Sequence, residues 1–292
     1  MSRPVQYGGQ ALIEGVMMRG PKVTAMAIRL PNGEIEVTKR EIKVWSAHLF
    51  WKLPLIRGFV ALIDSLIVGT KALMFSANRA VGEEEGEELS FGEMALTMVL
   101  SLGFGLLLFV GLPTGFAHLL KAKVPGVVLQ NLLEGGIRLV VFFAYILLIS
   151  RMKDIQRVFQ YHGAEHKAIY THEAGLELTV ENARPFSTLH PRCGTSFLLI
   201  VVVVSIFVFA FLGLDPLWWR ILSRIVLMPL VAGVAYEILK FSARHMDSPN
   251  WHWLIAPGLL LQKLTTREPD DQQLEVALAA LQGVLESGQE LS

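Results

Sequence analysis

The sequence has little that suggests a secreted or nucleic-acid-binding protein. One cysteine among 292 residues excludes an internal disulfide and fits a reducing compartment. The 26 Lys and Arg residues balance the 26 Asp and Glu residues, so no basic excess indicates a nucleic-acid partner. The N-terminal stretch MSRPVQYGGQ contains no apolar run, and we therefore expect no cleavable signal peptide.

Apolar residues, in contrast, are abundant. They make up 52% of the chain, whereas charged residues make up 18%, and the mean hydropathy is +0.47. A soluble protein of this length carries more charge, so the composition indicates a mainly α-helical membrane protein in contact with the lipid bilayer.

Two long apolar regions predict four transmembrane helices arranged as two hairpins, over residues 94–150 and 195–241. Four spans place both termini and the intervening segment 151–194 on the same side of the membrane. Lys and Arg are concentrated in these parts rather than in the hairpin ends, which predicts that they are cytoplasmic.

The first 44 residues predict a small cytoplasmic β element. Residues 24–30 and 34–43 have strand character on either side of a Pro-Asn-Gly turn. The glycine-rich stretch YGGQALIEGVMMRGP before them fits either a bulged strand and turn or a loop packed against a central site.

Residues 45–93 predict an amphipathic helix followed by an acidic linker at 83–88. Polar side chains recur every seven residues along the helix from Trp45 to Arg79, at Arg57, Asp64, Lys71 and Asn78. We expect this helix to lie in the membrane interface rather than to span the bilayer, because Asp64 would otherwise lie near its centre.

The last part, residues 242–292, predicts two further helices. Residues 251–264 resemble an interfacial helix anchored by tryptophan. Residues 271–286 form an amphipathic pattern, which we expect to dock on the soluble part of the chain or on a cytoplasmic protein partner. The apolar positions of this pattern are Leu274, Leu278, Leu281, Val284 and Leu285.

Three polar residues precede the apolar end of the first hairpin on one helical face: Asn131, Glu134 and Arg138. They either anchor the helix at the interface, which we favour, or face the interior of the bundle. Contact with Glu237 or other polar residues at membrane depth would indicate a transporter.

The segment 151–194 carries the pattern that indicates chemistry. His162, Glu165 and His166 form H-x-x-E-H, and residues four apart share one face of a helix. Two imidazoles on one face can bind one metal ion, and Glu165 then lies where it can act as a general base, as in inverted zincin motifs. Two helical histidines that only form hydrogen bonds on a solvated face are the alternative.

A second motif, His190-Pro-Arg-Cys193-Gly-Thr, offers an imidazole and a thiol in a bent loop. His and Cys are both good zinc ligands, so His190 and Cys193 are candidates to complete the site. Cys193 also fits two other interpretations, a small buried hydrophobic residue or a thiolate nucleophile paired with His190.

Four motifs together resemble the YqhQ-like family of bacterial integral membrane proteins, which are predicted to be metal-dependent enzymes. These motifs are GGQALIEGVMMRGP, DIQRVFQYHGAEHKAIY, LTVENARPFSTLHPRCGTSFL and LTTREPDDQQLEVAL, and the likeness extends from about Tyr7 to Leu281. The resemblance implies a bacterial inner-membrane protein whose signature positions include His162, Glu165, His166, His190 and Cys193.

Three functional hypotheses follow. The first is a zinc-dependent, hydrolase-like enzyme with its site at the cytoplasmic membrane face, with His162 and His166 as ligands and Glu165 as base. The second is a membrane scaffold or biogenesis factor, whose His/Cys segment is held by a structural metal or by hydrogen bonds. The third is a transporter. Three protein ligands with an open position favour the enzyme, whereas four protein ligands favour the scaffold.

Overall fold

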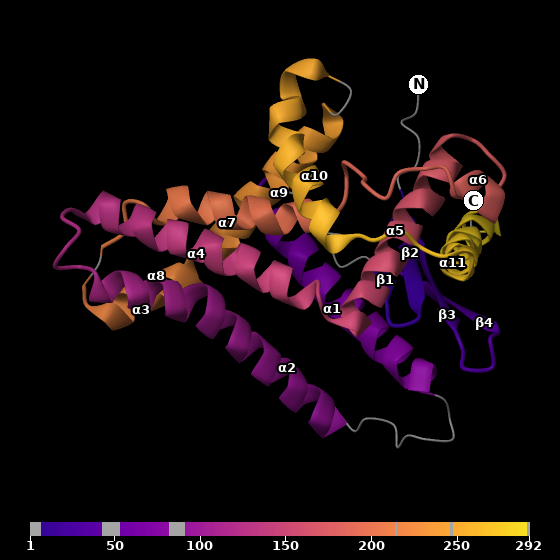
Figure 1. Ribbon diagram of the computed structural model, residues 1–292, viewed down its shortest axis with the longest axis horizontal. Coiled ribbons are helices and arrows are strands. Elements are labelled where there is room, and N and C mark those ends of the chain that lie inside the picture. Colours follow the sequence, from indigo (N-terminus) through magenta and orange to yellow (C-terminus); the bar gives the residue numbers. More distant parts are fainter. Residues whose placement is uncertain (1–6, 43–52, 82–90, 214, 246–247, 291–292) are drawn as a thin grey trace.

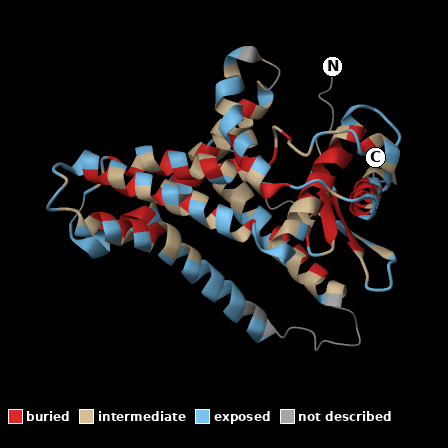
Figure 2. Cartoon of the chain, in the orientation of Figure 1, coloured by how far each residue is buried: buried red, intermediate tan, exposed pale blue. Residues whose placement is uncertain are grey.

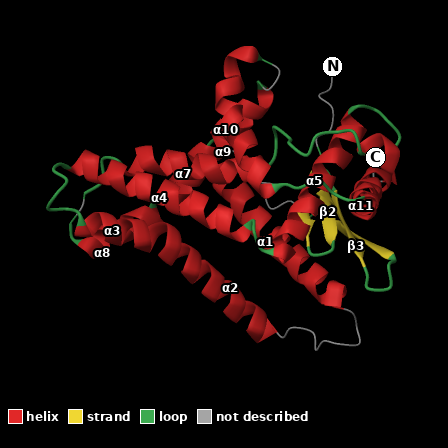
Figure 3. Ribbon diagram, in the orientation of Figure 1, coloured by secondary structure: helices red, strands yellow, loops and turns green. Residues whose placement is uncertain are grey.

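The computed structural model describes residues 7–42, 53–81, 91–213, 215–245 and 248–290 (Figure 1). This part of the chain is mainly helical, with one small β-sheet at the N-terminus, as expected (Figure 3). The acidic linker at 83–88 and the predicted start of the amphipathic helix at Trp45 lie outside the described residues.

The sheet is an antiparallel meander in the order β1-β2-β3-β4. Its strands are β1 (Gly8–Leu12), β2 (Gly15–Arg19), β3 (Val23–Arg29) and β4 (Ile35–Glu41). The two predicted strands correspond to β3 and β4, and the glycine-rich stretch forms the β1-β2 hairpin. Glu14 occupies the tight turn of this hairpin with a positive φ of 51°.

Helices cover both faces of the sheet, because alternate side chains of its strands are apolar on each face. One face packs against α5 (Lys153–Glu173) and α11 (Asp271–Glu290) through a core that includes Val16, Leu274 and Leu281. The opposite face packs against α1 (Ile56–Val81) through Leu12, Met17, Met26 and Ala72. The C-terminal helix therefore docks on the β element, one of the two positions expected for it.

Most of the remaining helices form an elongated bundle beside the sheet (Figure 1). They are α2 (Phe91–Leu106), a π-helix η2 (Leu107–Gly111), α3 (Leu112–Leu119), α4 (Val127–Ile149), α7 (Thr195–Phe209), α8 (Leu217–Val226) and α9 (Met228–Arg244). Exposed residues follow the outer side of α2, and many are apolar, including Val99 and Leu102 at 67% exposure each (Figure 2). An apolar outer surface of this extent fits contact with lipid.

Among the described residues, three helical stretches are long and apolar enough to cross a membrane, or four if a bent pair counts as one. The first predicted hairpin corresponds to two of them, Leu96–Leu119 and Val127–Ile149. The second differs from the prediction. Helix α7 has 15 residues, about 22 Å of helix against a bilayer core of about 30 Å, and α8 and α9 are bent by 42° at Leu227.

The third long apolar stretch is α1, for which we expected an interfacial position. Its polar stripe lies in part against protein, as that expectation required. The guanidinium of Arg19 on β2 lies 2.6 Å from Asp64, and Arg57 forms an ion pair with Glu237 on α9. Half of α1 therefore packs on the sheet and half on the bundle.

The polar trio of α4 corrects our preferred interpretation. Asn131, Glu134 and Arg138 are 2%, 1% and 3% exposed, so they face the interior of the bundle and do not anchor an interface. Glu134 binds Arg220 and Arg224 on α8, Asn131 binds Arg224, and Arg138 pairs with Glu134. Glu237 pairs with Arg57 instead.

Candidate metal centre

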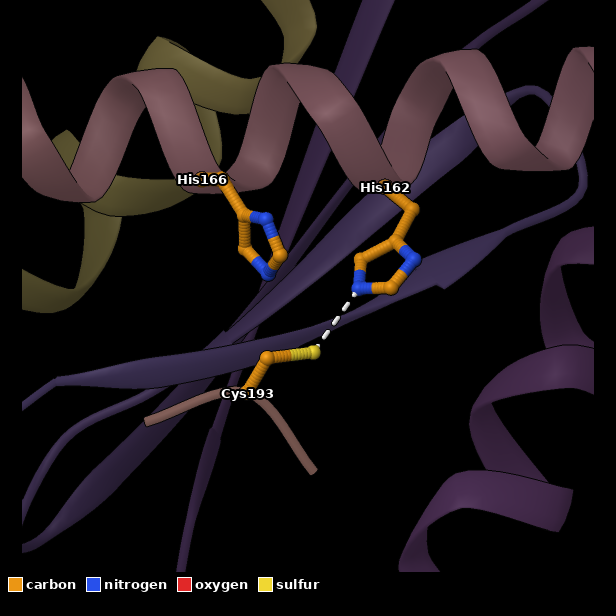
Figure 4. Close-up of side chains that lie close together, drawn as sticks. All are labelled: His162, His166 and Cys193. Carbon is orange, nitrogen blue, oxygen red and sulfur yellow. Dashed lines mark hydrogen bonds between the residues drawn. The ribbon is translucent and has the colours of Figure 1, made fainter. Parts of the chain in front are cut away.

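Helix α5 leads from the end of α4 to the site and places both motif histidines on one side. His162 and His166 are one turn apart, with ring centroids 4.5 Å apart, and both are buried at 8% and 1% exposure. Both rings point toward the loop that precedes α7 (Figure 4). The histidines therefore do not lie on a solvated face, which excludes the alternative considered for them.

Backbone carbonyls fix the protonation of both rings. The Nδ1 atom of His162 lies 2.8 Å from the carbonyl oxygen of Thr265, and that of His166 lies 2.5 Å from the carbonyl oxygen of Thr188. A carbonyl oxygen only accepts hydrogen bonds, so each Nδ1 must carry the proton and donate it. In the neutral ring each Nε2 then has a free lone pair, the form in which histidine binds a metal.

Cys193 completes the group from the other side (Figure 4). Its Sγ atom lies 3.1 Å from Nε2 of His162, and it also contacts the hydroxyl and the backbone N–H of Thr195 at 3.2 and 3.4 Å. The residue lies two positions before Thr195, the first residue of α7. The imidazole beside the thiol is thus that of His162 and not, as one interpretation held, that of His190.

The donor set fits a zinc ion. Ligand atoms of His162, His166 and Cys193 all lie within 4.8 Å of one another, and all three residues are buried. The Nε2 atom of His166 is buried without a hydrogen-bond partner among the described residues, as expected for an atom that binds a metal ion. Imidazole nitrogen and thiolate sulfur are the ligands that structural and catalytic zinc sites use.

His190 lies near this group but is not one of the three residues whose ligand atoms lie within 4.8 Å of one another. Its ring centroid is 5.6 Å from that of His166. Its Nδ1 accepts a hydrogen bond from the backbone N–H of Arg192, so in the neutral ring the proton is on Nε2, 3.6 Å from Glu173. Burial and the neighbouring His166 lower the pKa of His190 to about 3, which keeps the ring neutral. In this tautomer Nε2 has no lone pair for a metal.

Glu165 is turned toward the sheet rather than toward the loop. Its side chain packs against Gly9 on β1, where a β-carbon would come within 2.9 Å of its Cγ and Cδ atoms. Burial raises the pKa of Glu165 to about 7, although His162 and a hydrogen bond from the Gly9 backbone act in the opposite direction. The carboxyl group is therefore poised to exchange a proton near neutral pH.

Several residues that hold the site were not singled out from the sequence. Gln262 on α10 (His252–Thr265) accepts from the backbone N–H of His190 at 2.8 Å and donates to its carbonyl at 2.9 Å. Thr188 and Thr265 act through their carbonyl oxygens, which every residue has, so no sequence signal marks them. Thr195 was part of the motif with Cys193, and its place at the start of an apolar helix was the available signal.

The fold and the site define a class. This is a helical protein with three or four apolar candidate spans, a small N-terminal sheet and a buried His-His-Cys group between them.

The chain belongs to the family described as "Protein of unknown function (DUF1385)", which matches residues 53–287. It is also 38% identical over 295 residues to "Uncharacterized protein YqhQ" of Bacillus subtilis (strain 168), an alignment that covers 97% of this chain and 93% of the relative. This confirms the resemblance inferred from the four motifs. No solved structure matches the chain.

Proposed function

We propose that the protein is a metal-dependent, hydrolase-like enzyme of the bacterial inner membrane, with zinc as the metal and the site at the cytoplasmic membrane face. One observation carries the proposal: a ring nitrogen of His162, a ring nitrogen of His166 and the sulfur of Cys193 all lie within 4.8 Å of one another, and His190 is outside this group. Three protein ligands leave one position of a tetrahedral ion open, as in catalytic zinc sites.

In this proposal His162, His166 and Cys193 hold the ion, and Thr265 and Thr188 hold the two imidazoles in the binding tautomer. A bound zinc ion would supply Lewis-acid chemistry toward a substrate or a water molecule. Glu165 would act as the general base: it would accept a proton from a water molecule and return it later. Its pKa of about 7 supports this role. Its carboxylate would have to leave the backbone N–H of Gly9 to do so.

The order of the helices along the chain supports a position at the membrane face. Cys193 stands two residues before α7, and only three residues separate the end of α4 from the start of α5. The site therefore lies where the apolar bundle meets the sheet (Figure 1). The concentration of Lys and Arg in the flanking segments supports a cytoplasmic orientation for this side and for both termini.

A scaffold with a structural metal, or with a hydrogen-bonded His/Cys group, is the second candidate. The burial of the group favours it, because His162, His166 and Cys193 are all at most 9% exposed. A substrate would need an opening movement to reach the site. In this role the segment 151–194 would bind a cytoplasmic protein partner.

Cobalt substitution separates the two candidates without knowledge of the substrate. The full chain, purified in a neutral detergent, is loaded with Co²⁺ and its visible spectrum is recorded for wild type, His162→Ala and His190→Gln. The enzyme proposal expects one ion per chain, a sulfur-to-cobalt charge-transfer band, and a spectrum that changes when an external ligand such as azide enters the open position. His190→Gln should leave this spectrum unchanged, and His162→Ala should abolish it.

Failure of wild type to bind an ion would remove the enzyme proposal. If azide leaves the wild-type spectrum unchanged and His190→Gln changes it, the ion has four protein ligands and no open position. That result would favour the scaffold. The base role of Glu165 is tested by the pH dependence of the Co²⁺ spectrum in Glu165→Gln, with the exposed Glu181→Gln as the matched control. An unchanged pH dependence in Glu165→Gln would exclude that role.

A further inference from the structure

A second group of charged side chains lies inside the helical bundle, away from the metal centre. This arginine cluster consists of Glu134 and Arg138 on α4 and Arg220 and Arg224 on α8, with side-chain exposures of 2%, 4%, 0% and 0%. Arginine stays protonated in proteins, so three guanidinium groups face one carboxylate. The cluster carries a formal charge of +2 in a buried place.

Both oxygens of the single carboxylate, that of Glu134, already accept hydrogen bonds from neighbouring side chains. Oε1 of Glu134 accepts from Thr114 at 3.1 Å, from Arg138 at 2.9 Å and from Arg224 at 3.1 Å. Its Oε2 accepts from Nε of Arg220 at 2.9 Å. Glu134 therefore offers little acceptor capacity for further N–H groups.

The unsatisfied donors belong to Arg220. Arg138 finds acceptors in the carbonyl of Phe109 and the hydroxyl of Ser205, and Arg224 finds them in Asn131 and Ser223. The Nη1 atom of Arg220 is buried without a hydrogen-bond partner among the described residues. Its Nη2 lies 2.8 Å from Oε2 of Glu134 but is not directed to donate to it. A buried guanidinium with unpaired N–H groups is costly unless something else satisfies it.

Two other acidic groups in the described part of the bundle, Asp215 and Glu237, pair with cations outside the cluster. Asp215 pairs with Lys121 at the exposed end of the bundle, and Glu237 pairs with Arg57 on α1. The aromatic ring of Phe209 lies 5.2 Å from the guanidinium carbon of Arg138 and 5.6 Å from that of Arg224. A ring face attracts cations but does not neutralise them, so two positive charges remain.

The shape of α8 shows that these charges are turned inward. Arg220, Ser223 and Arg224 are buried, whereas Trp218 and Val226 are 64% and 63% exposed. The helix is amphipathic with its polar face inside and its apolar face outside, the reverse of a helix on a water-soluble protein. This pattern fits lipid outside and a polar ligand inside.

The backbone is irregular at the same place. The carbonyl of Phe109, which accepts from Arg138, belongs to the π-helix η2, and α8 joins α9 through the 42° bend. Single-turn π-helices and broken helices at membrane depth recur at binding sites.

We propose that the arginine cluster binds an oxyanion of the phosphate class, either a free anion or the phosphate of a lipid headgroup, with Arg220 as its main donor. The planar guanidinium fork matches two oxygens of a phosphate group. Two negative charges would cancel the excess of the cluster and one would halve it, and the oxygens of the anion would accept from Nη1 and Nη2 of Arg220. This site is separate from the metal centre and does not depend on the proposed enzyme.

The experiment follows thermal unfolding of the full chain in maltoside micelles by tryptophan fluorescence. Sodium phosphate is titrated against sodium chloride at equal ionic strength. Micelles containing phosphatidylglycerol are compared with micelles containing diacylglycerol, which lacks the phosphate. The variants are Arg220→Gln, Arg220→Lys, which keeps the charge but loses the fork, and Arg57→Gln, which breaks an ion pair outside the cluster.

Wild type should gain on the order of 5 °C in midpoint at saturation, from inorganic phosphate, from phosphatidylglycerol or from both, and so identify the source. Arg57→Gln should keep this gain. Arg220→Gln should lose it while unfolding no earlier than wild type without phosphate, because it removes one of the excess positive charges of the cluster and its buried N–H groups without a partner. If Arg220→Gln fails to fold, Arg220→Lys must bind at least tenfold more weakly. No gain in either arm, or equal gains in all variants, overturns the proposal.

Discussion

The Nε2 atom of His162 lies 3.1 Å from the Sγ atom of Cys193, although 31 residues separate them in the chain. An ion held by both atoms would cover the sulfur and occupy its lone pairs. Cys193 is the only cysteine, so a thiol reagent reports on this site alone. We expect one equivalent of Zn²⁺ to slow alkylation of Cys193 by roughly tenfold or more, measured by mass spectrometry.

The control for this experiment is His166→Ala, which removes a ligand without touching the His162–Cys193 contact. In this variant the protection by Zn²⁺ should be largely lost. Equal protection in wild type and variant would mean that the metal acts elsewhere.

Gly163 sits where the site has no room for a side chain. A β-carbon there would come within 2.1 Å of the carbonyl oxygen of Arg267 and 3.1 Å of Cγ2 of Thr188. We expect Gly163→Ala to lower the free energy of unfolding by about 1–3 kcal/mol. It should also weaken zinc binding by about 10–100-fold, because it displaces the segments that orient both histidines.

Gly136 on α4 provides the matched comparison, since a β-carbon there meets nothing within 4 Å. Gly136→Ala should leave zinc affinity unchanged and stabilise the helix by about 0.5–1 kcal/mol. Denaturant unfolding and a chelator competition measure both quantities. Similar losses for the two variants would contradict the tight approach at Gly163.

The buried carboxyl group of Glu165 makes the stability of the metal-free protein depend on pH. Its pKa is about 7 in the fold and near 4.5 when unfolded, so the unfolded chain loses the proton first. The free energy of unfolding should therefore fall as pH rises from 4.5 to 7, by about 1.4 kcal/mol per unit and on the order of 3 kcal/mol in all. Below pH 4.5 the carboxyl group is protonated in both states, so this loss of stability is absent.

Thermal unfolding in detergent with a chelator, between pH 5 and 8, measures this dependence. Glu165→Gln should remove most of the decline, and the exposed Glu181→Gln should keep it. A decline that survives in Glu165→Gln would assign it to other groups.

Because α11 docks on the sheet, we expect a leucine-to-alanine substitution in this core to lower the stability much more than one at an exposed leucine. Leu281 is fully buried in the core between the sheet, α5 and α11, whereas Leu260 on α10 is 61% exposed. Leu281→Ala should destabilise this part by about 2–5 kcal/mol and Leu260→Ala by less than about 1 kcal/mol. Hydrogen exchange of β2 and β3 is the measurement, and equal exchange in the two variants would contradict the packing.

Local sequence patterns were sufficient to predict much of the fold and part of the candidate metal centre. Helical spacing brings His162 and His166 together without any knowledge of tertiary structure, and the strand patterns of β3 and β4 are equally local. The tautomer of His190 was beyond reach, because it depends on which ring nitrogen the backbone N–H of Arg192 contacts. A tautomer follows from a three-dimensional hydrogen bond and not from residue spacing.

The arginine cluster could not be predicted from one helix, because its residues come from distant parts of the chain. Glu134 lies 86 residues from Arg220 and 90 from Arg224, so the helical face of α4 alone could not distinguish an interfacial anchor from a buried partner. The signal was in α8, where Arg220, Ser223 and Arg224 share one face and the opposite face is apolar. That pattern would have indicated an inward-turned polar face in a bundle surrounded by lipid.

The sheet is built from the first strands of the chain, yet one of its faces is closed by α11, about 240 residues later. During synthesis, at about 5–20 residues per second, Val16 and its neighbours on that face must wait many seconds after they emerge before their cover exists. The apolar hairpins between them are made first. The bundle helices are therefore synthesised before the sheet acquires its final partner, and that face of the sheet is not yet covered by α11 when they form.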